Sequence, residues 1–184
     1  MNTNDTHYVL DIETLGLCDN AIIASVGIVR MENGVQAGCF YITIDTEQPN
    51  RSYDEETMEW WGDDERSVAR AEFDGNIRLF PFSLKNALLG VAQFLNTDDE
   101  NETAPIWGNG SDFDNRILDH AFRQHGMQWP YWRNACLRTL RNLVGGERYT
   151  PTTERVKHIA INDAMTEAEE LIYLLNRIKI ESQT

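Results

Sequence analysis

Hydrophobic and polar positions change their spacing along this chain, and the change separates predicted strands from predicted helices. Residues 7–11 form a short apolar run that ends in acidic residues, which predicts a buried strand. Residues 21–31 are apolar and β-branched, Asn33-Gly34 follows, and residues 35–44 supply a second run of the same kind. An Asn-Gly pair between two such runs is typical of the two-residue turn of a β-hairpin. The first quarter of the chain is therefore predicted to form a strand followed by an antiparallel hairpin.

The rest of the chain mostly carries apolar residues at the three- and four-residue spacing of helices. The predicted helices span residues 52–71, 82–96 (begun by Pro81-Phe82-Ser83), 114–126, 133–144 and 159–180. A short strand is predicted at 104–107, and the stretches 96–103 and 149–157 are predicted loops. Strands that return between helices predict an α/β fold, in which helices cover a mixed sheet. No linker divides the chain, so we expect a single domain over residues 1–184 with its core at about 6–181.

The composition fits one globular domain. The chain has 184 residues, of which 41% are hydrophobic, and this length suffices to bury a core without covalent cross-links. Cys18, Cys39 and Cys136 are odd in number and unpatterned in spacing, which predicts reduced thiols in a reducing compartment. No apolar run approaches the roughly 20 residues of a membrane span, and the first residues lack the apolar core of a secretory signal. A cytoplasmic location without a membrane partner is the expectation.

The net charge of −14 argues at first against a nucleic-acid partner, because phosphate binding usually depends on a basic surface. The charge is uneven, however. Residues 41–74 carry eleven acids and three bases, whereas residues 115–160 carry eight bases and three acids. The basic segment leads toward His158 and is predicted to guide a phosphate backbone, while bound cations offset nearby carboxylates. Solvated helix faces are the alternative interpretation of these arginines.

Asp11 and Glu13 form the first candidate for chemistry. They alternate across the end of the first predicted strand, so they share one face if the strand continues regularly. Two carboxylates on one face repel each other unless a cation lies between them, and oxygen ligands suit magnesium or manganese. An exposed strand-end pair in a very acidic protein is the alternative. The apolar residues that precede the pair favour the metal site, because they place it at the edge of a core.

A second candidate lies in the segment 107–118, where glycines follow a predicted strand. Asp114 begins a helix there, and Phe113 and apolar residues after it point inward. Aspartate at a helix start is often only an N-cap, and this alternative weighs more heavily on Asp112 than on Asp114.

A third candidate is His158, followed five residues later by Asp163. On a regular helix this spacing points the two side chains apart. They address one site if His158 lies in the loop before the last helix and Asp163 lies on that helix. This arrangement is expected of a base that contacts water and a carboxylate that contacts metal.

Together these segments resemble the DEDDh family of 3′→5′ exonucleases, the superfamily of ribonuclease T and the proofreading exonucleases. The resemblance covers nearly the whole chain, and residues 57–61 and 107–110 look most similar to small exonuclease VIII-type and phage-type members. The matching motifs are Asp11-Ile12-Glu13-Thr14, Asn109 with Phe113-Asp114, and His158 with Asp163. Ser111-Asp112 departs from the family pattern and leaves the role of Asp112 open.

The resemblance implies a ribonuclease H-like fold and release of mononucleotides from the 3′ end of DNA or RNA. It implies two metal ions, Mg²⁺ or Mn²⁺, held by the four carboxylates at positions 11, 13, 114 and 163, with His158 as general base. The residues expected to hold the terminal nucleotide are Thr14, Leu15, Gly16, Asn109 and Trp61, with Leu17 as an alternative to Leu15 and Trp60 as a second stacking surface. Tryptophans on a helix are also common core residues, which is the alternative for both.

Two other classes of function stay open at this point. One is a catalytically silent nucleic-acid-binding module on the same fold, and the other is an acidic protein that mimics nucleic acid. The second explains the charge but leaves His158 unexplained. Residues 129–132, Trp-Pro-Tyr-Trp, are expected to be exposed and are a candidate contact of a homodimer. The sequence leaves the choice between DNA and RNA, and between single-stranded and duplex ends, undecided.

Overall fold

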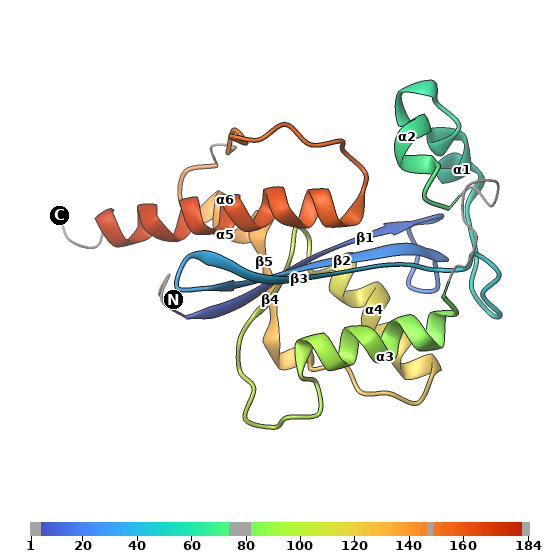
Figure 1. The fold of residues 1–184 in the computed structure, drawn as a ribbon, viewed down its shortest axis with the longest axis horizontal. Helices are drawn as coiled ribbons and strands as arrows, with labels where there is room; N and C mark the ends of the chain where they lie inside the picture. The colour runs from blue at the N-terminus through green and yellow to red at the C-terminus, as the bar shows by residue number, and fades with distance from the viewer. Residues whose placement is uncertain (1–4, 74–81, 147–148, 182–184) are drawn as a thin grey trace.

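The computed structural model of the chain describes residues 5–73, 82–146 and 149–181 (Figure 1). The predicted helix start at Pro81 therefore lies outside the described residues. The strands are β1 (Thr6–Thr14), β2 (Ile23–Glu32), β3 (Val35–Thr43), β4 (Ile106–Gly108) and β5 (Asn134–Cys136). The α-helices are α1 (Glu55–Trp61), α2 (Ser67–Arg70), α3 (Leu84–Leu95), α4 (Asp114–Gln124), α5 (Leu137–Leu143) and α6 (Ala160–Glu181). Two 3₁₀ turns, Asp64–Arg66 and Tyr131–Arg133, precede α2 and β5.

The strands form one mixed sheet in the order β3-β2-β1-β4-β5. β1, β2 and β3 are antiparallel neighbours, whereas β1 pairs with β4 and β4 with β5 in parallel. Asn33 and Gly34 both have positive φ, which fits the predicted hairpin turn. The predicted strand, hairpin and mixed sheet are confirmed.

Helices cover both faces of the sheet, with α5 and α6 on one face and α3 and α4 on the other (Figure 1). The alternation of β1 divides its side chains between these two layers. Tyr8, Leu10 and Ile12 enter the core against α3 and α4, whereas Val9 enters the core against α5 and α6. The positions that follow Val9 on the same face are Asp11 and Glu13. No helix in the described part of the chain is both long and apolar enough to cross a membrane.

The single helix predicted over residues 52–71 is wrong. α1 ends at Trp61, and the chain restarts as a 3₁₀ turn and then as α2. Two capping aspartates determine where the separate pieces begin. Asp54 accepts a hydrogen bond from the amide of Thr57 at the start of α1, and Asp63 accepts one from the amide of Glu65 at the start of the 3₁₀ turn. An N-cap at Asp63 begins a new helical turn, so the helix does not continue through it.

The helix predicted over 133–144 begins later than expected, at Leu137. Residues 134–136 are instead the edge strand β5, paired with β4 from Asn134 to Cys136. Arg133 fixes the entry to this strand, because its buried guanidinium donates to the carbonyls of Leu95 and Ala104. Three residues are too few to show a strand period, so the helical spacing dominated the prediction.

The expectation of an exposed aromatic segment at 129–132 is wrong for Trp129, which is buried and donates its indole N–H to Asn134. Tyr131 and Trp132 are exposed.

Candidate active site

The three sequence motifs meet at one end of β1, between the sheet and α6. Asp11 and Glu13 come from β1, and Asp114 comes from the first turn of α4. His158 lies in the turn before α6, and Asp163 lies in the first turn of that helix. All five side chains line one cleft of about 930 Å³, together with Asn109. The parallel pairing of β1 with β4 brings the segment after β4 beside the end of β1. The structure therefore brings together every residue that the motifs identified as catalytic.

The turn before α6 holds His158 outside the helix. His158 has a φ of 62°, and its backbone N–H donates to Oδ2 of Asp163 at 2.7 Å. This bond ties the turn before α6 to the first turn of the helix. One ligand atom each from Glu13, His158 and Asp163 lie within 4.8 Å of one another, close enough for a shared cation.

The carboxylates of the cleft are crowded and poorly compensated. Burial, together with the charges of Glu167 and Glu13, raises the pKa of Asp11 well above its ordinary value. Burial and the charge of Asp163 raise the pKa of Glu13 to about 9, and burial raises that of Asp114 to about 7. Oδ2 of Asp11 is buried and has no hydrogen-bond partner within the described residues. A buried carboxylate oxygen without a donor fits a site that a cation completes.

Asp114 and Asp112 differ sharply in their surroundings. Asp114 is 4% exposed and lines the cleft, whereas Asp112 is exposed at the preceding turn. Gly108 allows the close approach of α4, since a Cβ there would lie 3.0 Å from Oδ2 of Asp114. Asn109 accepts a hydrogen bond from Arg141 through its side chain and one from the amide of Arg138 through its carbonyl.

The ring of His158 packs edge-to-face against Trp60, with 4.8 Å between the ring centroids. Burial lowers the pKa of His158, and this effect exceeds the opposing one of Asp163. A lowered pKa favours the neutral imidazole, which is the form that accepts a proton.

A second, mostly apolar cleft of about 380 Å³ adjoins the first, because Ile12, Glu13 and Phe113 line both. Its other lining residues are Thr14, Leu17, Glu56, Thr57, Trp60 and Trp61.

The residues expected to bind the nucleotide are partly buried beside this cleft and partly exposed in it. Trp61 is 2% exposed and donates its indole N–H to the carbonyl of Thr14, whereas Trp60 is 40% exposed. Leu15 is buried beside Trp61 in a small core, and Gly16 packs against Asp54. Leu17 is exposed and lines the cleft instead.

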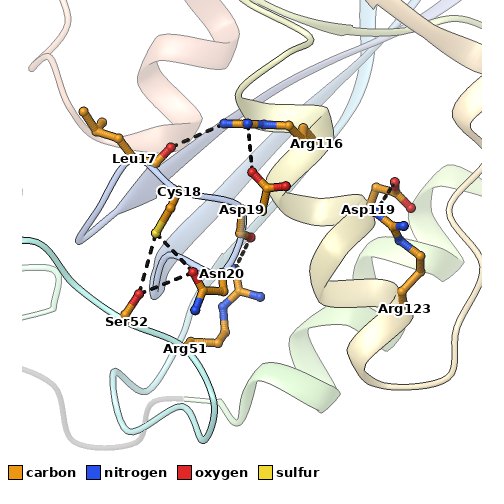
Figure 2. A network of polar contacts seen from close by, with 9 residues as sticks. All are labelled: Leu17, Cys18, Asp19, Asn20, Arg51, Ser52, Arg116, Asp119 and Arg123. Carbon is orange, nitrogen blue, oxygen red and sulfur yellow. Dashed lines mark hydrogen bonds and ion pairs between the residues drawn. The ribbon is translucent and has the colours of Figure 1, made fainter.

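The loop that carries Leu17 is held by polar contacts from distant segments (Figure 2). Arg116 of α4 forms an ion pair with Asp19 at 2.8 Å and also reaches the carbonyl of Leu17. Arg51 donates to the carbonyls of Ala21 and Asp19 from the other side. Neither role was predicted from the sequence, although Arg116 belongs to the basic segment.

Two further acids that line the cleft are buried and were also missed. Glu167 and Glu170 follow Asp163 on α6, and both are buried. Glu170 forms a two-bond ion pair with Arg141. The four-residue spacing from Asp163 to Glu167 was the signal available in the sequence.

Solved structures of nucleases share this fold. The chain is similar to cell-death related nuclease 4 (CRN-4), with 16% identity, a TM-score of 0.63, and coverage of 96% of this chain and 66% of that one. The chain is also similar to the nuclease domain of 3′hExo, a DEDDh family member bound to rAMP, with 11% identity, a TM-score of 0.63, and coverage of 94% of this chain and 92% of that one. A third similar structure is exonuclease I of E. coli in complex with a dT13 oligonucleotide, with 13% identity, a TM-score of 0.67, and coverage of 97% of this chain and 43% of that one.

These likenesses confirm the predicted ribonuclease H-like fold, and at such identities they concern the fold alone. The chain spans less than half of exonuclease I and about two thirds of CRN-4. No curated protein matches the chain. The sequence model of one protein family, the 3′-5′ exoribonuclease Rv2179c-like domain, matches residues 6–175, which include the whole cleft. The chain belongs to this family of 3′-5′ exonucleases.

Proposed function

We propose that the chain removes nucleoside monophosphates from the 3′ end of RNA, with two divalent cations and His158 as general base. The observation that carries the proposal is the convergence of Asp11, Glu13, Asp114, His158 and Asp163 in one cleft. The preference for RNA rests on the family, whose description is that of an exoribonuclease.

Asp11, Glu13, Asp114 and Asp163 would hold the cations. They offer only oxygen ligands, which suits Mg²⁺ or Mn²⁺. Their raised pKa values show that the folded chain disfavours their charges, and a cation removes that disadvantage. When bound, such ions stabilise charge on the attacking and leaving oxygens.

His158 would take the proton from the attacking water through a neutral ring nitrogen. The water oxygen then bonds to phosphorus, while the bond from phosphorus to the 3′ oxygen of the preceding nucleotide breaks. The released nucleotide keeps the 5′ phosphate. Trp60 packs against the imidazole, and Asp163 holds its backbone, so the ring is oriented before substrate arrives.

The apolar cleft would hold the terminal base. Trp60 and Leu17 are exposed there, and base–aromatic stacking contributes about 1–3 kcal/mol per base. Trp61 serves this site indirectly, because its bond to Thr14 fixes the backbone beside Glu13.

Arg138 and Lys157 would contact the phosphates of the upstream strand. Both are exposed and line the cleft, whereas Arg155 is paired with Glu169 and Arg141 with Glu170. Within the described residues neither Arg138 nor Lys157 forms an ion pair, so the basic segment offers two cationic side chains beside the carboxylates, which answers the objection raised by the overall charge of −14.

The test uses RNA and DNA strands labelled at the 5′ or the 3′ end, with Mg²⁺, Mn²⁺ or chelator. We expect 5′-labelled RNA to shorten stepwise and 3′-labelled RNA to release labelled mononucleotide at once. Asp11→Asn should abolish both results, whereas Asp112→Asn, an equal loss of charge on an exposed side chain, should not. A wild-type chain that binds RNA without cleaving it would instead support the silent binding module.

A further inference from the structure

Three acids on α6 face the same cleft. Asp163, Glu167 and Glu170 follow one another at intervals of four and three residues, which places them on one side of a helix. All three line the cleft that also contains Asp11 and Asp114. Glu167 lies in the middle of this row, one helical turn beyond Asp163.

The other two acids have partners. Asp163 accepts the backbone N–H of His158 at 2.7 Å. Glu170 receives two bonds from Arg141, at 2.6 and 2.8 Å, and this pairing occupies Arg141. Their positions are therefore explained without any bound ion.

Glu167 has no such explanation. Its side chain is only 8% exposed, and its Oε2 atom is buried with no hydrogen-bond partner in the ranges 5–73, 82–146 and 149–181. Leaving a buried carboxylate oxygen without a donor is destabilising, so such groups are normally paired or bound to metal. A helix position this close to the sheet accepts an apolar residue at lower cost.

Asp11 is in the same condition on the opposite side, since its Oδ2 is also buried without a partner. Asp11 and Glu167 line the same cleft, one from β1 and the other from α6. Two buried carboxylate oxygens without partners among the described residues thus belong to one site.

We propose that Glu167 is a fifth carboxylate of the metal site and binds, together with Asp11, one of the two cations. The inference rests on the proposed function for the presence of those cations. The ligand is a hard divalent ion, because the two groups offer only carboxylate oxygens. A proton shared between Glu167 and Asp11 is the competing explanation, and it predicts a different outcome below.

The experiment measures Mn²⁺ binding to the full chain at neutral pH, by calorimetry and by the electron paramagnetic resonance of free Mn²⁺. We expect wild type to bind two ions. Glu167→Gln should weaken one of them about 10- to 100-fold, the usual effect of losing a group that supports a metal site. Glu154→Gln is the matched control, because Glu154 lines the same cleft but is exposed at its rim. It should leave both affinities unchanged.

Glu167→Asp separates contact from charge. It keeps the negative charge but shortens the side chain by one methylene. If the carboxylate binds the ion directly, the shortened side chain no longer reaches it, whereas an electrostatic effect without contact is kept. We expect Glu167→Asp to weaken the same ion as Glu167→Gln. Full affinity in Glu167→Asp would overturn the proposed contact, and this comparison also decides the matter if the glutamine variant does not fold.

Thermal unfolding in chelator provides the second measurement. Removing a buried unpaired carboxylate should raise the Tm of metal-free Glu167→Gln, while the increase in Tm on adding Mn²⁺ should become smaller. Unchanged Mn²⁺ binding with a lowered Tm in chelator would overturn the inference and support the shared proton. A wild-type chain that binds no Mn²⁺ would refute the proposed function itself, which a failure confined to Glu167 would leave intact.

Discussion

Replacing Gly27 with alanine should disable the site without touching any residue in it. Gly27 lies in β2, directly opposite Asp11 in the strand pairing. A Cβ at this position would lie 2.4 Å from the carbonyl carbon of Ala160 and 2.4 Å from the amide nitrogen of Ile161. Both atoms belong to the backbone of the first turn of α6, so no side-chain rotation relieves the overlap.

The size of the effect follows from these distances. An ordinary contact needs about 3.4 Å, so the first turn of α6 must move away from the sheet by about 1 Å. Asp163 moves with that turn, whereas Asp11 and Glu13 stay on β1. A displacement of about 1 Å in a catalytic group costs on the order of 10²-fold in rate. Overpacking of this kind also costs about 1–3 kcal/mol of stability.

The assay compares kcat/KM on 3′-labelled RNA with Mn²⁺, alongside urea unfolding of each variant. Gly38→Ala is the control, because a Cβ at Gly38 of β3 would lie no closer than 3.9 Å to Phe94. We expect Gly27→Ala to lose about 10²-fold in kcat/KM while remaining folded, and Gly38→Ala to stay near wild type in activity. Full activity of Gly27→Ala would refute the argument that the close contact of α6 with β2 sets the site geometry.

Four other predictions concern the acids, the histidine, the pH dependence of stability and the core. Asp114→Ala should reduce the rate of RNA cleavage far more than Asp112→Ala, because only Asp114 is buried in the cleft; the reverse order would mean that the second motif is misassigned. His158→Ala should cost about 10²–10⁴ in rate with Mn²⁺ binding largely kept, and the wild-type rate should rise with pH to a plateau at or below neutrality, since burial lowers this pKa; turnover near normal in the variant would exclude the base. In chelator, the free energy of unfolding should fall as pH rises from about 4 toward 9. The reason is that the folded chain binds protons at Glu13 and Asp114 (pKa about 9 and 7) more tightly than the unfolded chain does (pKa 4.5 and 3.8). Mn²⁺ should remove this pH dependence, and a flat profile of urea unfolding against pH in chelator would contradict the prediction. Arg133→Ala should cost about 3 kcal/mol in urea unfolding, because it leaves two carbonyls without donors, and a loss below 1 kcal/mol would contradict that account.

The sequence alone determined the elements whose signals are local. The hairpin is specified by Asn33-Gly34 between two β-rich runs, and α3 and α6 by helical spacing over many residues. The alternation in β1 assigned Asp11 and Glu13 to one face, and the structure places that face against α6. These features depend on φ preference and on side-chain period, which neighbouring residues decide among themselves.

Short elements were not determined in this way. β5 contains three residues and exists because β4 offers it backbone partners, so its period is invisible in the sequence. The break at residues 62–63 arises from a cap, and helical spacing on both sides concealed it.

The site itself is decided by tertiary contacts. Spacing identified its five candidate residues, but only the parallel pairing of β1 with β4 and the close approach of α6 at Gly27 bring them into one cleft. The four-residue spacing from Asp163 places Glu167 on the same side of the helix, but the sequence does not show that a buried oxygen of Glu167 lacks a hydrogen-bond donor. A partner for a buried charge comes from segments far away along the chain, and local sequence carries no information about whether one arrives.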